Sequence, residues 1–460
     1  MHQVGPPREL STLASRLLAK TLAPTPTPFS SAVHPHIQTL GPCLFPSPLR
    51  HIGGVEAPFK TDEDRVLFEH RTTGDVADTE PLSFEEAGPR EHIFFDPART
   101  TVGIVTCGGL CPGLNDIIRG IVNQCHLQYG ITRVIGFRYG YEGLVQRYGH
   151  TPVTLKPASV AQAHNFGGTL LGSSRGAQNI GAMVDTLEDM NIDILFVIGG
   201  DGTLRGAAEI VKEIERRGLK KSVVGIPKTI DNDIMYLDKS FGFETAFAEA
   251  VQAVKCAYIE ATGAVNGVGL VKLMGRDSGF IACYAALAGS NVDFVLIPEV
   301  PFVLDGPRGL LETLRYRLAK RGNVVMVVSE GAGQELMSGI TGTDASGNQK
   351  YGDIGLFLKD RINSFFKERS VEVNLKYIDP SYIVRSVPAN AQDNVYCSRL
   401  AQGAVHAAVA GKTGMLVGRW HGSFVNLPLE LVTQGRRKVH PSGELWHSVL
   451  ESTGQPHRFG

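Results

Sequence analysis

The sequence predicts an α/β fold built from parallel sheets that are covered by helices. From about residue 100 onward, short apolar segments alternate with longer segments of helix-like pattern. The short segments are apolar at every position rather than at every second one, which is typical of strands buried on both faces. The chain has 460 residues, which is enough for two or three domains of ordinary size.

The strand candidates share β-branched and other apolar residues, and they lie at 102–106, 133–137, 192–198, 222–226, 267–273, 294–297, 324–328 and 414–417. The helix candidates alternate with them, and they lie near 115–129, 204–218, 243–260, 278–289, 307–321, 355–368 and 393–411. This alternation indicates parallel sheets with helices on their faces. Ligands of such sheets bind beyond the carboxyl ends of the strands, so site residues are expected there.

Composition and charge exclude several classes of protein. The chain holds 53 glycines, about 11.5% of its residues against a usual share of roughly 7%. These glycines are not periodic and accompany 43% hydrophobic residues, which excludes a collagen-like fibre and a wholly disordered chain. The 45 basic and 46 acidic residues nearly cancel, which argues against broad electrostatic binding to nucleic acid or an anionic membrane. Seven cysteines without zinc-ligand spacing indicate reduced thiols and a cytoplasmic location.

Residues 1–60 are predicted to form an N-terminal extension that lies on the globular body. Residues 1–50 hold nine of the 25 prolines, and Glu9 is the only acidic residue before Glu56. An acid-poor start of this kind also fits the transit peptide of a plastid or another organelle. It contains no apolar stretch of the signal-peptide type, so secretion is not expected.

Two glycine-rich loops suit a ligand that carries phosphate. The loop at 106–115 reads TCGGLCPGLN, in which Gly109 permits close approach to the backbone and the following helix N-terminus favours an anion. The loop at 167–176 reads GGTLLGSSRG and ends with Arg175 and Gly176, so a guanidinium lies among glycines and hydroxyls. Taken alone, each loop is equally compatible with an unliganded turn and a solvated arginine.

Two acidic motifs follow the next strand candidates. In IGGDGT at 198–203, the carboxylate of Asp201 ends a buried strand and is the hard oxygen ligand that Mg²⁺ requires. In PKTIDND at 227–233, Asp231 and Asp233 are two residues apart, which makes a plausible general-base site. The alternatives are a helix cap at Asp201 and an Asx turn with solvated acids at 231–233.

The order of these four motifs, followed by MGR at 274–276 and YIVR at 382–385, closely resembles the 6-phosphofructokinase family across roughly residues 95–425. The residues within these motifs are similar to those of the branch that includes plant and kinetoplastid ATP-dependent enzymes. That branch is close in sequence to the pyrophosphate-dependent enzymes. The resemblance implies two Rossmann-like parallel-sheet domains with the active site in the cleft between them. It assigns residues 61–242 plus 386–460 to an ATP-binding domain and residues 243–385 to a fructose 6-phosphate-binding domain.

The family transfers the γ-phosphoryl group of ATP to the 1-hydroxyl of fructose 6-phosphate in glycolysis. The resemblance implies that Asp231 accepts the proton of that hydroxyl without needing a strongly perturbed pKa, that Arg276 and Lys228 assist, and that Asp201 holds Mg²⁺. Asp233 would assist through water. The implied ATP-binding residues are Gly109, Arg175, Gly176, Gly200, Asp201, Gly202 and Thr203. The implied substrate-binding residues are Thr229, Ile230, Asp231, Met274, Gly275, Arg276, Glu330, Tyr382, Ile383, Val384 and Arg385.

Two residues bear on the choice of phosphoryl donor. In the family, Gly at position 202 leaves space for the α-phosphate and nucleoside of ATP, whereas pyrophosphate users carry Asp there. Lys228, in contrast, matches the pyrophosphate-using pattern, and bacterial ATP-dependent members have Gly at that place. Exclusion is easier to build than preference, so Gly202 predicts ATP, with pyrophosphate as the alternative.

Departures from the family pattern limit what the resemblance implies about assembly and control. A homotetramer or homodimer is expected, yet Gly267 stands where bacterial members place an arginine from a neighbouring subunit, and Lys376 replaces another arginine. Arg119 matches one effector-site arginine, while Asn123 replaces a second, so allosteric effectors cannot be inferred.

Two other functions are open from the sequence. GGDGT alone also fits an NAD- or lipid-kinase-like protein, which leaves the later motifs unexplained. A catalytically inactive regulatory subunit should lack the base or the metal ligand, whereas Asp231 and Asp201 are both present.

Overall fold

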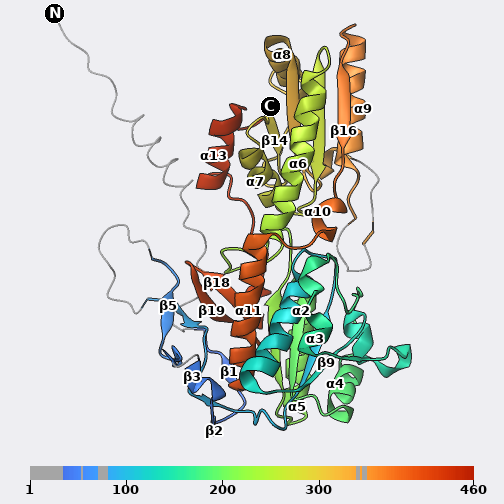
Figure 1. Cartoon of the computed structure of the whole chain (residues 1–460). Helices are drawn as coiled ribbons and strands as arrows, with labels where there is room; N and C mark the ends of the chain where they lie inside the picture. The colour runs from blue at the N-terminus through green and yellow to red at the C-terminus, as the bar shows by residue number, and fades with distance from the viewer. Residues whose placement is uncertain (1–34, 53–54, 71–80, 338–341, 344–349) are drawn as a thin grey trace, which may run out of the picture.

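In the computed structural model of the chain, the described residues are 35–52, 55–70, 81–337, 342–343 and 350–460. They form two α/β bodies, each built around its own sheet, which lie one above the other in Figure 1. The α/β class with two sheet domains, predicted from the sequence, is confirmed. The first part of the predicted N-terminal extension, residues 1–34, lies outside the described residues.

Within these ranges the larger sheet has nine strands in the order β10-β9-β8-β11-β12-β18-β19-β6-β5. They are β5 (Arg65–Leu67), β6 (Ser83–Glu86), β8 (Thr101–Thr106), β9 (Arg133–Gly136), β10 (Val153–Thr154), β11 (Ile194–Gly199), β12 (Ser222–Pro227), β18 (Met415–Trp420) and β19 (Ser423–Pro428). The five central strands from β9 to β18 run parallel, and the outer strands run antiparallel to their neighbours. The central strands therefore end at one common edge.

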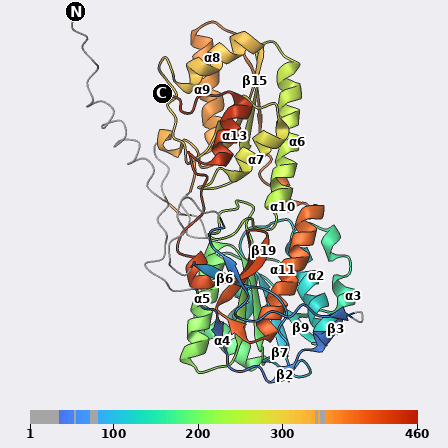
Figure 2. The same cartoon turned by 90° about the vertical axis from the view of Figure 1, so that its left-hand side faces the viewer.

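Helices cover both faces of the larger sheet, as Figure 2 shows. They are α2 (Leu114–Asn123), α4 (Ile180–Asp189), α5 (Asp201–Arg216) and α11 (Ala391–Val409). Side chains of β11 alternate between two cores, because successive residues of a strand point to opposite faces. Phe196 and Ile198 join the core under α2 and α11, whereas Leu195 and Val197 join the core under α4 and α5.

The smaller sheet, again within the described residues, has four parallel strands in the order β14-β15-β13-β16. They are β13 (Gly267–Leu273), β14 (Phe294–Leu296), β15 (Asn323–Ser329) and β16 (Asn374–Ile378). Its helices are α6 (Phe243–Thr262), α7 (Phe280–Gly289), α8 (Leu310–Arg321) and α9 (Ile354–Glu368). The helices α6 and α7 pack on one face, and α8 and α9 pack on the other.

Short elements fasten the described start of the chain to the larger body. They are β1 (Gln38–Thr39), β2 (Phe45–Pro46), β3 (His51–Ile52), β4 (Val55–Glu56), β7 (His92–Ile93) and β17 (Lys412–Thr413). A further short helix, α3 (Pro157–Val160), packs on α2. β1 pairs with β17 and β2 pairs with β7. Ile37, Leu40 and Leu49 are buried, so residues 35–49 pack on the body through apolar side chains.

Over the described ranges the chain passes between the two bodies three times. It enters the smaller body at α6 and returns after α10 (Ile383–Ser386). It crosses again between α12 (Leu429–Val432) and α13 (Glu444–Thr453), and α13 packs on α7 and β14. All of residues 386–460 were expected in the larger domain. The structure differs at α13, because its buried Trp446 and Val449 face the smaller body.

Candidate active site

Three central strands of the larger sheet end side by side, and a polar motif follows each of them. β8 and β12 flank β11, with Thr106 opposite Ile198 and Gly199 opposite Pro227. The glycine loop after β8, the Asp201 motif after β11 and the Asp231 motif after β12 therefore meet at one edge, as the topology of parallel sheets dictates.

Lys228 is the cation at the centre of this edge. Its side chain is 6% exposed, and its Nζ donates a hydrogen bond of 2.7 Å to the carbonyl of Gly109. Burial lowers the pKa of Lys228 below its ordinary value, because the charged form is poorly solvated there. No carboxylate of the described residues forms an ion pair with Lys228. A buried ammonium in this position gains by meeting an anion, so Lys228 is suited to a phosphate.

Asp231 lies where the two bodies meet. Its N–H donates to Thr229 Oγ1 (3.1 Å), and its carbonyl accepts from Ser278 Oγ of the smaller body (3.0 Å). Burial first, and then the charges of Asp233 and Glu330, raise the pKa of Asp231 to about 8. Such a carboxyl group can exchange a proton near neutral pH, which a general base requires. So large a shift was not expected from the sequence.

The smaller body brings Arg276 and Glu330 to the same place, from the ends of β13 and β15. The Arg276 N–H donates to Glu330 Oε1 over 3.2 Å, and the positive charge of Arg276 opposes the pKa rise at Asp231. Arg276 has a left-handed φ of 48°, and a Cβ at Gly331 would lie 1.9 Å from its carbonyl oxygen. The position of Arg276 is therefore held by backbone contacts that require glycine nearby.

Asp233 extends the carboxylate cluster toward Asp201. Its Oδ1 accepts from Thr229 Oγ1 over 3.1 Å, so Thr229 bonds to both Asp231 and Asp233. Burial raises the pKa of Asp233, and the charge of Asp201 adds to the rise. The acidic pair predicted from the spacing thus shares one low-dielectric environment, together with Asp201.

Asp201 has the position and the free carboxylate oxygen that a magnesium ligand needs. It begins α5 after β11, one of its oxygens (Oδ1) is buried without a hydrogen-bond partner, and the other is 2.9 Å from Arg205 Nη2. Among the described residues, no three His, Cys, Asp or Glu side chains lie close enough together to form a complete metal site. Mg²⁺ is commonly held by one or two carboxylates together with substrate phosphates, so this sparse arrangement suits it.

Two guanidinium groups converge over Gly109. A Cβ built on Gly109 would lie 3.4 Å from Arg175 Nη2 and 3.5 Å from Arg385 Nη1. Within the part of the chain that the structure describes, no carboxylate pairs with either arginine. Lys228 bonds to the same glycine, so three cations face one loop, as expected of a site for phosphate. The residues predicted for the donor and for the sugar phosphate meet here.

The remaining predicted residues differ in accessibility. Tyr382 is 75% exposed and Ile383 is 62% exposed, and the Arg385 guanidinium lies 5.0 Å from the centre of the Tyr382 ring. Val384 and Ile230 are buried in the core, so their side chains contribute packing rather than a surface for a ligand. Gly176 is exposed, and Met274 packs against the core of the smaller body.

Gly202 lies in the first turn of α5 and faces open space. A Cβ built there has no heavy atom of the described residues within 4 Å, and its φ is not in the left-handed region. The nearby Gly199 is different, because a Cβ there would lie 2.4 Å from Thr203. The packing of the described residues therefore does not require glycine at 202. Its effect is to leave the space beside Asp201 open.

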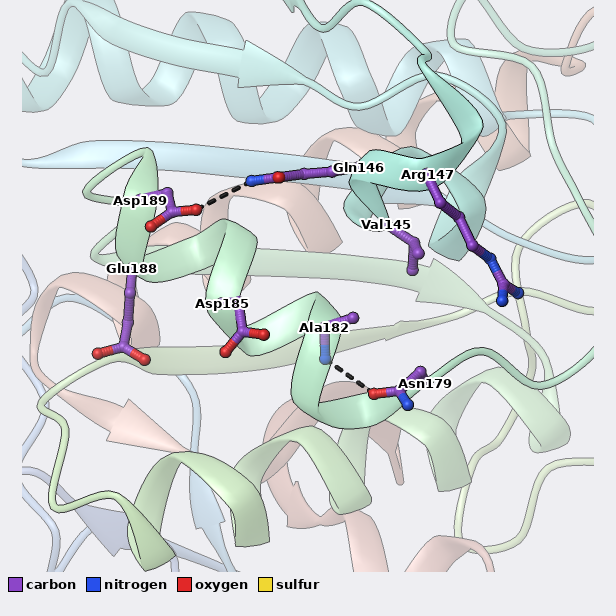
Figure 3. Close-up of a pocket in the computed structure, with 8 residues that line it drawn as sticks. All are labelled: Val145, Gln146, Arg147, Asn179, Ala182, Asp185, Glu188 and Asp189. Atoms are coloured by element: carbon purple, nitrogen blue, oxygen red, sulfur yellow. Dashed lines mark hydrogen bonds between the residues drawn. The ribbon is translucent and has the colours of Figure 1, made fainter.

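A hollow on the larger body lies apart from these residues. Figure 3 shows it between α4 and the turn at 145–147, with Gln146 Nε2 donating to Asp189 Oδ2 over 2.9 Å. Its lining includes Asp185, Glu188 and Asp189 and none of the predicted site residues. Arg147 is the one basic residue of this lining, and three carboxylates against one cation do not suit a phosphate ligand.

Sequence reasoning missed two residues at the centre of the site. Arg436 lies among Asp201, Asp233 and Asp277, and Asp277 accepts a hydrogen bond from Tyr351. Asp277 directly follows the MGR segment, so its position was a usable signal. Arg436 lies in the run Arg-Arg-Lys at 436–438, which carries no motif and is distant in sequence from every other site residue.

No helix among the described residues has the length and apolar character needed to cross a bilayer.

A family model described as "Phosphofructokinase" matches residues 101–408. An ATP-dependent 6-phosphofructokinase of Amycolatopsis methanolica is 48% identical over 438 residues, covering 92% of this chain and 95% of the relative. ATP-dependent 6-phosphofructokinase 7 of Arabidopsis thaliana is 48% identical over 382 residues, which cover 82% of this chain and 78% of the relative. The ATP-dependent 6-phosphofructokinase of Trypanosoma brucei brucei is 44% identical, covering 89% of this chain and 85% of its own.

Solved structures show the same fold. A pyrophosphate-dependent phosphofructokinase from Marinobacter aquaeolei superimposes with a TM-score of 0.63 at 19% identity, covering 77% of this chain and 91% of its own. The phosphofructokinase of Pichia pastoris in the T-state gives a TM-score of 0.58 at 22% identity, covering 77% of this chain and 37% of its own. At these identities the likeness extends to architecture alone.

Proposed function

The chain belongs to the phosphofructokinase family, and from this premise we propose that it transfers the γ-phosphoryl group of ATP to the 1-hydroxyl of D-fructose 6-phosphate, giving fructose 1,6-bisphosphate and ADP. The observation that carries the proposal is the position of Asp231. It lies between the two bodies, with the charges of Arg276 and Lys228 acting on its carboxyl group. A proton acceptor beside cations is what phosphoryl transfer to a hydroxyl needs.

In the proposed reaction, Asp231 accepts the proton of the 1-hydroxyl as that oxygen attacks the γ-phosphorus. Arg276 and Lys228 stabilise the charge on the transferring group and the leaving phosphate. Asp201 would hold Mg²⁺, which when bound would neutralise charge on the donor phosphates. Thr229 fixes Asp231 and Asp233 relative to each other through its two hydrogen bonds. Glu330 and the backbone near Met274 line the sugar side, and Arg385 with Tyr382 takes the 6-phosphate.

The donor is proposed to be ATP, because the open space at Gly202 accommodates an α-phosphate. The compartment is proposed to be the cytoplasm, in keeping with seven free thiols, and the assembly to be a homotetramer or homodimer. Sedimentation or light scattering of the purified chain measures the assembly directly.

The test is the rate of fructose 1,6-bisphosphate formation by the purified chain with ATP and with pyrophosphate. We expect turnover with ATP and little or none with pyrophosphate. Asp231→Ala should lower kcat by at least ~10², the low end for loss of a general base, with a circular-dichroism spectrum like that of the wild type. Near-normal turnover by a folded Asp231→Ala variant would remove Asp231 from this role, and activity only with pyrophosphate would overturn the choice of donor.

A further inference from the structure

The segment 434–439 carries the chain from the larger body to the smaller one, and it passes directly beside the carboxylate cluster. Arg436 is bridged to Ile234 in antiparallel fashion, and the Arg437 N–H donates to the Asp233 carbonyl over 2.7 Å. The Val439 N–H donates to Glu299 Oε1 of the smaller body over 2.8 Å. The backbone at Arg436 is thus held on both sides of the cleft.

The side chain of Arg436 reaches three carboxylates at once. Its Nη2 is 3.5 Å from Asp201 Oδ2, its Nε is 3.9 Å from Asp233 Oδ2, and its Nη1 is 3.3 Å from Asp277 Oδ2. Close charge-assisted bonds of this type measure about 2.7–2.9 Å, so these three are longer ion pairs. The side chain remains 26% exposed, and therefore borders the open part of the site.

The neighbouring arginine fastens the segment instead. Arg437 Nη1 donates to the carbonyls of Leu237 (3.1 Å) and Asp238 (2.9 Å), and its guanidinium lies 4.8 Å from the centre of the Phe280 ring. Burial lowers the pKa of Arg437 below its ordinary value, as expected for a guanidinium enclosed by protein. The attachment of this stretch therefore belongs to Arg437, whereas the Arg436 side chain is directed at the carboxylates of the site.

We propose that Arg436 is a further phosphate-binding residue of this active site, which turns from the carboxylates to oxygens of the donor phosphates when the donor binds. This inference rests on the proposed function. Donor binding brings Mg²⁺ to Asp201 and several negative charges beside it, so a guanidinium at the same carboxylate is repelled by the metal and attracted by the phosphates. The planar fork of arginine suits two phosphate oxygens. Arg436 lies beyond residues 101–408, which the family model matches.

The test compares Arg436→Gln with Arg205→Gln, a control that removes a cation from the same carboxylate on the exposed side. Arg205 Nη2 is 2.9 Å from Asp201 Oδ2, and its side chain is 57% exposed. Calorimetry measures equilibrium binding of Mg·ATP without sugar phosphate, and separately of Mg²⁺ alone. We expect Arg436→Gln to weaken Mg·ATP binding at least ~10-fold, the scale of one lost charge-assisted bond. Mg²⁺ alone should bind at least as tightly as in the wild type, because a competing cation is gone. Arg205→Gln should change Mg·ATP affinity less than ~2-fold.

Arg436→Lys keeps the charge but not the planar fork, so it should bind Mg·ATP more tightly than Arg436→Gln and less tightly than the wild type. If Arg436→Gln does not fold, Arg436→Lys replaces it in the binding comparison. Unchanged or tighter Mg·ATP binding by folded Arg436→Gln would overturn the proposal, because Arg436 would then be only a competitor of the metal. A wild-type chain that binds Mg·ATP but does not phosphorylate fructose 6-phosphate would overturn the proposed function, and the binding comparison would still decide the role of Arg436. A wild-type chain that binds no Mg·ATP would overturn both.

Discussion

Asp231 has an environment that makes its ionisation unfavourable in the ligand-free protein. Its pKa is about 8 in the folded chain and about 3.9 in an unfolded one. Between these values the folded state keeps a proton that the unfolded state has lost, so stability falls as pH rises from about 4 to about 8.

Replacing Asp231 by Asn removes this proton linkage. We expect the melting temperature of ligand-free Asp231→Asn to exceed that of the wild type, and the excess to be larger near pH 8.5 than near pH 4.5 by about 2 °C or more. Differential scanning calorimetry at both pH values measures the effect. Asp305→Asn, at a carboxylate that is 68% exposed, is the control. A gain that is the same at both pH values would show that ionisation of Asp231 is not its cause.

Gly202 offers a direct test of donor choice. A Cβ at this position has no heavy atom of the described residues within 4 Å, and Asp is favourable in the first turn of a helix, so we expect Gly202→Asp to fold with a melting temperature close to that of the wild type. Its carboxylate should repel the α-phosphate and lower kcat/KM for ATP by ~10-fold or more, or about 1.4 kcal/mol. Gly202→Ala, without a charge, should lose less. Initial rates with ATP and with pyrophosphate measure the effect, and equal losses for the two variants would contradict the charge argument.

The site residues that the sequence could predict are those that follow strands. Asp201 and Asp231 are each adjacent to an apolar strand, so their meeting follows from the parallel topology. Arg436 could not be found in this way, because its approach to Asp201 depends on where a segment 235 residues later crosses the cleft. The raised pKa of Asp231 could not be predicted from the sequence either, because it arises from burial and from the charge of Glu330, which follows a strand of the other sheet.

At the scale of elements, α6 begins with a cap supplied by a distant helix. Its preceding residue Gly242 has no side chain, and Asp393 of α11 accepts from the N–H groups of Gly242 (3.0 Å) and Thr245 (2.8 Å) and from the Thr245 hydroxyl. Asp393 is fully buried. One carboxylate therefore satisfies the first turn of the helix that begins the smaller body.

Removing that carboxylate should destabilise the protein. We expect Asp393→Ala to lower the free energy of unfolding by about 2–4 kcal/mol, because it removes a cap and leaves buried N–H groups without acceptors. Asn390→Ala is the matched control, since Asn390 caps α11 through one bond to the Asp393 N–H and should cost only about 1 kcal/mol. Urea denaturation measures both, and equal losses would contradict the cross-helix cap.

Elements with continuous apolar sequence were predicted well, and elements with mixed sequence were not. The candidate at 267–273 coincides with β13, whose residues are almost all buried. β16 was missed, because its five residues are partly exposed and lie at the edge of the smaller sheet. α4 was also missed, although Asn179 caps it and Ile180, Met183, Val184 and Leu187 have helical spacing, so that signal was present.

At the scale of the whole molecule, Glu299 joins the crossing segment to the smaller body. Its Oε1 accepts from the N–H groups of Gly279 (3.0 Å), at the start of α7, and Val439 (2.8 Å). We expect Glu299→Ala to raise hydrogen exchange at residues 434–440 and to lower kcat, because the segment that carries Arg436 loses its hydrogen bond to the smaller body, while Arg437 still holds it to the larger one. Glu299→Gln retains an acceptor oxygen, so its hydrogen exchange and its kcat should lie between those of the wild type and those of Glu299→Ala. Mass-spectrometric hydrogen exchange measures the effect, and unchanged exchange in a folded Glu299→Ala variant would contradict it.

The third crossing has a consequence for synthesis of the chain. The side chain of Gln455 bonds to both the N–H (2.6 Å) and the carbonyl (3.2 Å) of Val295, and so completes the outer edge of β14. A ribosome delivers residues in order, and earlier domains fold while later ones are still being made. Here the edge of the smaller sheet needs Gln455, and the position of Arg436 needs the segment 434–439. Both follow β19, the last strand of the two sheets. The nascent chain thus contains nearly all side chains of the proposed active site before the contacts that fix Arg436 and the edge of the smaller sheet can form.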